Sequence, residues 1–248
     1  MSGFVDSVSI YEADGQDPID WRRFPFNVPA IRNLGQMTLN PAVTFLAGEN
    51  GSGKSTLIEG MAIRLGFGEQ GGTRNFNFGQ REVDGRLHDY MRFERTPGHR
   101  RESDGFFLRA ESFFNVATEI DQLQSVDGGM YAHYGGKSLH RLSHGEAFIA
   151  LVQNRFHDES LFLLDEPEAA LSPARQLVLL KEIHWLVSSG CQFIIATHSP
   201  ILMAYPRSSI YWLDQKGAQL VEWEQIEHVE LTRSFLNSPH TFMRHLLE

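Results

Sequence analysis

Short apolar runs rich in β-branched and aromatic residues recur along the chain, and each is bounded by Gly, Pro, Asn or Asp. Such runs predict strands, here at 42–47, 90–95, 106–110, 161–165, 192–197 and 210–213. Apolar residues at helical spacing predict helices at 54–65, 112–123, 145–156, 173–188 and 239–247. Because apolar strands alternate with helices at both ends of the chain, the pattern predicts an α/β fold around a mixed sheet.

The middle of the chain, about residues 74–145, follows a different pattern. It holds two adjacent β-runs with no helix between them, and then a helix and a Gly-rich loop at 128–137. We therefore expect an antiparallel β part in this region. We also expect a small helical lobe at about 112–145, inserted in the core of a single domain that spans 1–248.

Composition and charge narrow the class of protein. With 248 residues, of which 42% are hydrophobic and 21% charged, the chain can bury a sizeable core, which excludes disordered and fibrous proteins. Its net charge of −9 opposes binding to nucleic acid or anionic lipid, except at a local basic patch. Cys191 is the single cysteine, which excludes a disulfide framework and fits a reducing compartment. No apolar run approaches the roughly 20 residues of a membrane helix, and no signal peptide is evident. We therefore expect a cytoplasmic protein without a membrane partner.

A glycine-rich segment follows the first strongly apolar strand and opens the first long helix. It matches the phosphate-binding pattern G-x-x-x-x-G-K-[ST] in the context that the pattern requires, between a strand and a helix. Backbone N–H groups would surround phosphate oxygens, Lys54 would reach the β- and γ-phosphates of ATP, and the Ser55 hydroxyl would ligate Mg²⁺. The predicted nucleotide-binding residues are Gly48, Glu49, Asn50, Gly51, Ser52, Gly53, Lys54, Ser55 and Thr56.

A carboxylate pair, Asp165 and Glu166, ends the apolar run at 161–165. Asp165 would hold Mg²⁺ directly or through water and so complete the site that Ser55 begins. Glu166 comes one residue later, so it points off the other side of the strand end and can polarise the attacking water as a general base. An ordinary acidic turn after a buried strand is the alternative, and the presence of a phosphate loop argues against it.

Two further segments discriminate among nucleotide-binding proteins. The sequence LSHGE at 142–146 opens a helix, where Ser143 and Gly145 would offer a hydroxyl and helix-terminal N–H groups to an anion. Ser143 and Glu146 also have the spacing of a capping box, and both interpretations can hold together. His198 follows a buried strand in a polar turn, a position where a lone histidine is more often structural than catalytic.

Together these segments resemble an ABC-type ATPase, in the order phosphate loop, LSHGE signature, Asp-Glu-Pro, a D-loop-like segment at 168–172 and a switch histidine. In that class, the signature of one subunit closes on the γ-phosphate held by the other. The resemblance therefore implies a homodimer that forms around ATP and Mg²⁺. It also implies that Ser143 and Gly145 act in trans, that Glu166 is the catalytic base and that His198 contacts the γ-phosphate.

The residues that flank these motifs indicate which branch of the ABC-type ATPases the chain resembles. The signature helix EAFIALVQNRF lacks the Gln-Arg-rich continuation usual in transporter subunits, and the sequence Thr197-His198-Ser199-Pro200 is typical of the non-transporter branch, which includes SMC, recombination-repair and OLD-type ATPases. A coiled-coil arm is excluded because no heptads lie between the phosphate loop and the signature. The whole chain resembles a compact bacterial family of AAA/ABC-type ATPases, notably in the segments at 71–76, 106–118 and 231–239.

One position departs from the family pattern. ABC ATPases normally carry a Gln after a strand between the phosphate loop and the signature, where it touches Mg²⁺ and the water, but here the strand at 106–110 is followed by Glu111. We expect Glu111 at the metal site, with Gln80 as the competitor and an ordinary first-turn carboxylate as an equally good account of Glu111. Arg32 resembles a basic residue that related ATPases aim at the nucleotide, although a solvated surface arginine is the account that we slightly favour.

Residues 74–101 carry seven arginines and no lysine, a local excess of positive charge in an acidic chain. Arginine suits bidentate phosphate contacts, so a nucleic-acid surface is one hypothesis, and a solvated face of two antiparallel strands is the alternative that we favour.

Three functions remain open from the sequence. The first is a Mg²⁺-dependent ATPase that acts as a motor or switch for an unknown macromolecular partner, with DNA metabolism or defence as its setting by analogy alone. The second is the energising subunit of a transporter. The third is a slow nucleotide-sensing interaction module.

Overall fold

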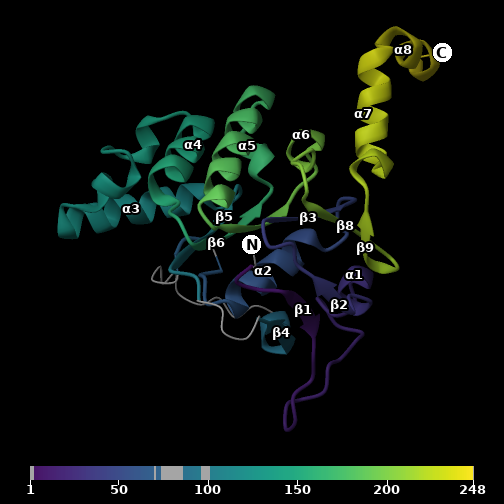
Figure 1. Ribbon diagram of the computed structural model, residues 1–248, viewed down its shortest axis with the longest axis horizontal. Helices are drawn as coiled ribbons and strands as arrows, with labels where there is room; N and C mark the ends of the chain where they lie inside the picture. The colour runs from purple at the N-terminus through teal and green to yellow at the C-terminus, as the bar shows by residue number, and fades with distance from the viewer. Residues whose placement is uncertain (1–2, 70, 74–85, 96–100, 248) are drawn as a thin grey trace.

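The central element of the fold is a six-stranded mixed sheet. A computed structural model describes residues 3–69, 71–73, 86–95 and 101–247 (Figure 1). The strands have the order β5-β6-β7-β3-β8-β9, and every neighbouring pair is parallel except β8 and β9. Their bounds are β3 Val43–Gly48, β5 Asp104–Arg109, β6 Ser160–Asp165, β7 Gln192–Ala196, β8 Ser209–Asp214 and β9 Gly217–Val221. The expected mixed α/β sheet is confirmed.

A second, three-stranded antiparallel sheet has the order β2-β1-β4, with β1 at Ser7–Ile10, β2 at Gln36–Thr38 and β4 at Met91–Glu94. The expected antiparallel part therefore exists, and only one of the two adjacent β-runs of the middle region belongs to it. The two adjacent β-runs of the middle region do not pair with each other, because β4 pairs with β1 and β5 pairs with β6. Four consecutive residues of β5 are buried, and such a strand belongs in a sheet covered on both faces.

Helices cover both faces of the larger sheet (Figure 1). On the face that carries the phosphate loop's helix lie α1 Pro29–Arg32, α2 Lys54–Arg64 and the short 3₁₀ helix η1 Leu87–Tyr90, beside the smaller sheet. The other face is covered by α3 Phe113–Asp127, α4 His144–Arg155, α5 Pro173–Ser188 and α6 Pro200–Met203, with the 3₁₀ turns η2 Met130–Tyr134, η3 Leu139–Arg141, η4 Pro167–Ala170 and η5 Trp223–Gln225. The chain ends with α7 Glu227–Asn237 and α8 Pro239–Leu247.

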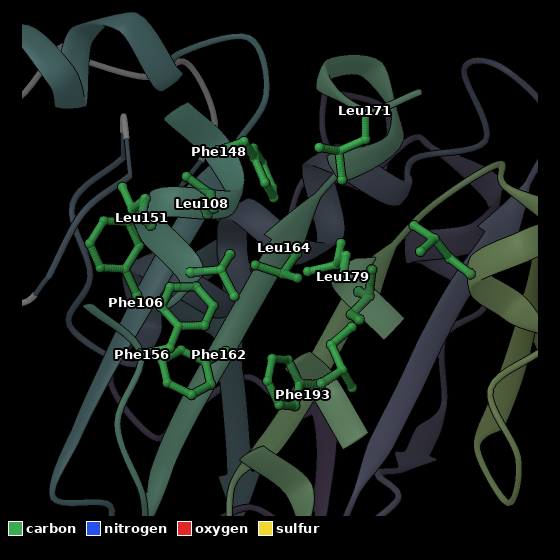
Figure 2. Close-up of a cluster of buried hydrophobic side chains, with 14 of the residues drawn as sticks. Phe106, Leu108, Phe148, Leu151, Phe156, Phe162, Leu164, Leu171, Leu179 and Phe193 are labelled. Atoms are coloured by element: carbon green, nitrogen blue, oxygen red, sulfur yellow. The ribbon is translucent and has the colours of Figure 1, made fainter. Parts of the chain in front are cut away.

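Two apolar clusters fill the space between the sheet and its coverings. Successive residues of a strand point to opposite faces, so Phe162 and Leu164 of β6 pack toward α4 and α5, while Leu161 and Leu163 pack toward α2. Figure 2 shows the first cluster, in which the ring of Phe162 stacks on Phe156 at a centroid distance of 4.0 Å. Both faces of β6 are therefore buried, and its carboxyl end leads to Asp165 and Glu166.

A helical lobe is formed by α3 and the turns η2 and η3 that precede α4. The Asp121 carboxylate of α3 accepts hydrogen bonds from Tyr131 Oη at 3.1 Å and Ser138 Oγ at 2.7 Å. These contacts join α3 to the turns that precede α4.

The last helix was predicted, whereas α7 was not. Figure 1 shows α7 standing away from the sheet with α8 folded back at its end. The pair leaves large apolar side chains exposed, at Leu231, Leu236, Met243, Leu246 and Leu247. Among the described residues, none of these or the other helices is long and apolar enough to cross a membrane.

Candidate active site

The phosphate loop connects β3 to α2 and needs glycine at two points. Gly48 has a φ of +150°, and a Cβ there would lie 2.5 Å from the carbonyl oxygen of Leu213. Gly53 caps α2 in the left-handed region at a φ of +99°, and its Cβ would lie 2.8 Å from Val28 Cγ1. No side chain fits at either place, so the backbone can approach a ligand closely. The N–H groups of the first turn of α2 then face the loop, as anion binding requires.

Lys54 is held inside this loop. Only 4% of the residue is exposed, and its Nζ donates hydrogen bonds to the carbonyl oxygens of Gly48 at 3.0 Å and Glu49 at 2.9 Å. Burial lowers the pKa of Lys54, while the charges of Glu166 and Asp165 act in the opposite sense. A buried ammonium whose hydrogen bonds go to neutral carbonyls is short of negative charge, and a phosphate would supply it.

Ser55 and Asp165 meet although they are far apart in sequence. The Ser55 hydroxyl donates to Asp165 Oδ1 at 3.0 Å, which joins the start of α2 to the carboxyl end of β6. Asp165 is buried, and burial raises its pKa to about 6 against the opposing charge of Arg109 and the Ser55 hydrogen bond. Two hard oxygen donors at one point fit Mg²⁺, which takes few protein ligands and completes its shell with phosphate and water. In keeping with that sparse donor set, no group of three or more His, Cys, Asp or Glu among the described residues could hold a metal.

Glu166 and His198 lie beside this pair. Glu166 adopts a φ of +50°, an unfavourable backbone region for a residue with a side chain, and strain of this kind gathers at functional sites. Its Oε1 lies 3.7 Å from His198 Nε2, a buried nitrogen with no hydrogen-bond partner in the described part of the chain. Burial and the charge of Lys54 lower the pKa of His198, so the imidazole is neutral at pH 7. The site thus pairs a carboxylate with a neutral imidazole.

The signature residues occupy the start of α4. Ser143 and Glu146 form the expected capping box, with the Ser143 N–H and hydroxyl donating to Glu146 Oε2 at 3.0 and 2.6 Å. Within the described chain, the other hydrogen-bond partner of the Ser143 hydroxyl is Arg175 of α5, not a residue of the phosphate loop. Gly145 is buried against the same arginine. One copy of the chain therefore does not join its signature to its own phosphate loop through these contacts.

Comparisons with known proteins point to one family. No protein-family model matches the chain. A protein of Caldanaerobacter subterraneus subsp. tengcongensis, provisionally named an ABC transporter ATP-binding protein, is 29% identical over 185 residues, which cover 69% of this chain and 75% of that protein. The cobalt import ATP-binding protein CbiO of Salmonella typhimurium is 27% identical over 249 residues, which cover 89% and 88%. Both relatives are named as ATP-binding proteins, and the fold and motifs described above are those of an ABC-type ATPase.

More distant similarities extend the comparison. The ABC transporter G family member STR2 of Medicago truncatula is 23% identical over 210 residues, so the match covers 77% of the ATPase but only 28% of the plant protein. Among solved structures, cbiO1 of Clostridium perfringens, described as part of the ABC transporter complex cbiONQ, aligns with a TM-score of 0.46 and 19% identity over 98% of this chain and 99% of that one. The SMC head domain from Thermotoga maritima aligns with a TM-score of 0.43 and 14% identity over 89% and 98%. Both scores are below 0.5, so the fold assignment rests on the strand order and motifs of the ATPase itself.

Three predicted site residues have less direct support in the ATPase. Thr56 is half-buried on α2 and lines a cavity of about 120 Å³ beside Phe24 and Pro25. Arg32 ends α1, which packs against Gly53 of the phosphate loop, but its own side chain is exposed. The third, Glu111, has an 85% exposed side chain that lies 3.7 Å from Arg109, and its competitor Gln80 lies outside the described residues.

Arg109, which the sequence analysis missed, is the centre of a buried charge cluster. Its side chain is 18% exposed and lies 2.9 Å from Glu59, 3.5 Å from Asp165 and 3.7 Å from Glu111. Burial raises the pKa of Glu59, and the charge of Arg109 opposes that rise. The contact with Asp165 Oδ2 leaves Oδ1 to Ser55, so Arg109 orients the carboxylate of the candidate metal site.

Two other contributors to the site, Glu168 and His228, were given no individual role from the sequence. Glu168 is a buried carboxylate of η4 that accepts the N–H of His198 at 2.5 Å, and burial raises its pKa. His228, at the start of α7, lies 3.2 Å from Glu49 of the phosphate loop, and its ring lies 5.6 Å from that of His198. Glu168 could have been found because it stands two residues after Glu166, whereas His228 belongs to a helix that the sequence did not predict.

The described part of the arginine stretch has local partners. Arg95 forms a two-point contact with Glu102 at 2.6 and 3.1 Å, and Arg92 lies over the ring of Tyr11 at 5.4 Å. Arg74, Arg81 and Arg100 lie outside the described residues. These contacts favour a structural role for the arginines that can be described.

We expect Arg109→Met to destabilise the ATPase by about 3 kcal/mol, because it leaves the buried carboxylate of Asp165 and the partly buried carboxylate of Glu59 without their cation. The matched control, Arg92→Met on the exposed side of β4, should change stability by less than about 0.5 kcal/mol. Urea unfolding at pH 7 followed by circular dichroism measures both. Equal losses in the two variants would show that the cluster does not need its cation.

Proposed function

We propose that the chain binds Mg²⁺–ATP in the phosphate loop and hydrolyses it with Glu166 as the general base. The contact of Ser55 with Asp165 carries this proposal, because it places a hydroxyl and a carboxylate at the mouth of the loop that buries Lys54. Glu166 lies next to Asp165 at the same strand end, where a water attacking the γ-phosphate would need a proton acceptor.

Each residue then has a definable task. The loop N–H groups and Lys54 bind the phosphates, and Lys54 exchanges its bonds to the Gly48 and Glu49 carbonyls for bonds to phosphate oxygens. Ser55 and Asp165 would hold Mg²⁺, which would supply positive charge to neutralise the phosphates. Glu166 takes the proton of the attacking water on its carboxylate. His198, neutral and with no hydrogen-bond partner at Nε2 among the described residues, would hydrogen-bond the γ-phosphate or Glu166.

We further propose that two copies of the chain enclose the nucleotides, with Ser143 and Gly145 of one copy facing the γ-phosphate held by the other. The N-terminus of α4 is suited to an anion by its free N–H groups and its dipole. Ser143 is exposed, and its hydrogen bonds in the described structure stay within the α4–α5 region. A second copy would give this exposed end an anion to bind.

Glu166→Gln should retain ATP binding while lowering turnover by at least about a hundredfold, because the amide cannot accept the proton of the attacking water. Lys54→Ala should instead weaken ATP binding by about tenfold or more, through loss of charge-assisted hydrogen bonds. Steady-state phosphate release and equilibrium binding of a fluorescent ATP analogue measure the two effects.

Glu182→Gln on α5 is the matched control, and it should behave as wild type in both assays. Wild-type turnover by Glu166→Gln would refute the assignment of the base. Wild-type protein that binds ATP with no measurable turnover would favour the nucleotide-sensing alternative.

ATP should also drive dimerisation, most visibly in Glu166→Gln, where hydrolysis cannot reset the complex. Light scattering coupled to size exclusion, with and without Mg²⁺–ATP, should show a monomer becoming a dimer. A protein that stays monomeric at saturating ATP would contradict the sandwich. A dimer equally tight without nucleotide would show that other surfaces hold it.

The partner driven by ATP is a separate question. The signature helix and the turn at 197–200 favoured the non-transporter branch, and we predicted from the sequence that the chain has no membrane partner. The relatives support the other alternative, because the three described above are all named as transporter proteins. We therefore propose that the chain is the peripheral energising subunit of a membrane transporter at the cytoplasmic face, in preference to a role in DNA metabolism or defence.

Fractionation of the native host tests this partner. An epitope-tagged chain should sediment with membranes, resist treatment with nuclease, and be released by alkaline carbonate as a peripheral subunit is. Recovery only in the supernatant would contradict the transporter assignment. Sedimentation that nuclease abolishes would favour nucleic acid as the partner instead.

A further inference from the structure

Arg175 has no role in the motifs, yet its side chain contacts three residues of the signature, which are Ser143, Gly145 and Glu146. It belongs to the first turn of α5, where its own N–H donates to the Ser172 hydroxyl at 3.4 Å. Its guanidinium donates to Ser143 Oγ at 3.3 Å and lies 3.2 Å from Glu146 Oε1. A Cβ on Gly145 would lie 2.6 Å from Arg175 Nη1, so the glycine makes room for the arginine.

The signature needs such a cation because it carries a carboxylate of its own. Hydrogen bonds from the Ser143 hydroxyl and N–H lower the pKa of Glu146, with the charges of Arg175 and Lys137 acting in the same sense. Glu146 is therefore ionised at pH 7. An ionised carboxylate one residue from Gly145 repels a triphosphate, and Arg175 is the cation in direct contact with that carboxylate.

The Ser143 hydroxyl must also give up a hydrogen bond before it can donate to a phosphate. A hydroxyl has one hydrogen to donate, and in the described structure that hydrogen goes to Glu146 Oε2 at 2.6 Å. To donate to a phosphate, the hydroxyl must turn away from Glu146. Arg175 at Oε1 and the Ser143 N–H at Oε2 would still satisfy the carboxylate after that turn.

We propose that Arg175 is the positioning residue and counter-charge of the signature, which makes the Glu146 carboxylate compatible with the γ-phosphate of ATP held by a second copy of the chain. This inference rests on the sandwich put forward under the proposed function. Arginine suits the task better than lysine because its planar fork can contact Ser143 and Glu146 at once. Its side chain remains 35% exposed, so it can also approach the phosphate.

The decisive test is a charge-compensation cycle in the Glu166→Gln background, measured as the ATP concentration that gives half-maximal dimer. Arg175→Ala should raise that concentration by about tenfold, which is within the usual range of coupling between contacting charges. Glu146→Gln should change it by less than about threefold, because the amide needs no counter-charge. Arg175→Ala combined with Glu146→Gln should return to within about threefold of Glu146→Gln alone.

Two controls separate this role from a packing role. Lys137→Ala removes a cation that acts on Glu146 only through space, so it should shift dimerisation less than Arg175→Ala does. Arg175→Gln keeps a long polar side chain without the charge, and it should match Arg175→Ala. Binding of a fluorescent ATP analogue to the monomer should be unchanged in all these variants, because none touches the phosphate loop.

The outcomes distinguish the two proposals. A parent Glu166→Gln protein that never dimerises with ATP overturns the sandwich, and the role of Arg175 with it. A parent that dimerises while Arg175→Ala and Arg175→Gln dimerise at the same ATP concentration overturns the role of Arg175 alone. A double variant as defective as Arg175→Ala also overturns it, since the loss would then come from packing and not from the charge of Glu146.

Discussion

The parallel hydrogen-bond register of β3, β7 and β6 is the constraint on which the active site depends. Leu46 pairs with Ala196, and Ala196 pairs with Asp165, so the three strands end at one level. Parallel strands present their carboxyl ends at the same edge of a sheet. The phosphate loop, the Asp165–Glu166 pair and the turn that holds His198 therefore emerge together. A register shift of one residue would turn Asp165 to the opposite face of the sheet.

Buried charge distinguishes this edge from the rest of the core. Four charged side chains are largely removed from water, those of Lys54, Asp165, Glu168 and Arg109. Burial lowers the pKa of Lys54 and raises the pKa values of Asp165 and Glu168, so that each shift favours the neutral form of the group. The fold tolerates this cost because Arg109 and Lys54 supply positive charge close to the carboxylates. Groups that find incomplete partners in the protein alone are suited to a ligand that brings its own charges, as a magnesium-bound triphosphate does.

The signature lies in a different part of the structure, and its arrangement depends on contacts around the start of α4 and not on the register of the strands. The start of α4 is ordered by contacts within its own lobe and with α5, and Ala170 of η4 packs against Gly145. The same η4 turn carries Glu168, which accepts the N–H of His198. The segment after Glu166 thus touches both the histidine beside the candidate base and the signature.

The sequence by itself determined the phosphate loop, the Asp165–Glu166 pair, the capping box at Ser143 and most of the strands and helices of the main sheet. These features are local, because loop geometry, helix capping and a buried strand each depend on residues close together in the chain. Tertiary structure alone decided what distant residues do to one another. It paired β4 with β1, set Arg109 between Glu59 and Asp165, brought His228 of an unpredicted helix to Glu49, and laid Arg175 on the signature. No periodicity or motif encodes these contacts, because each joins elements whose separation in space is fixed by packing and not by spacing along the chain.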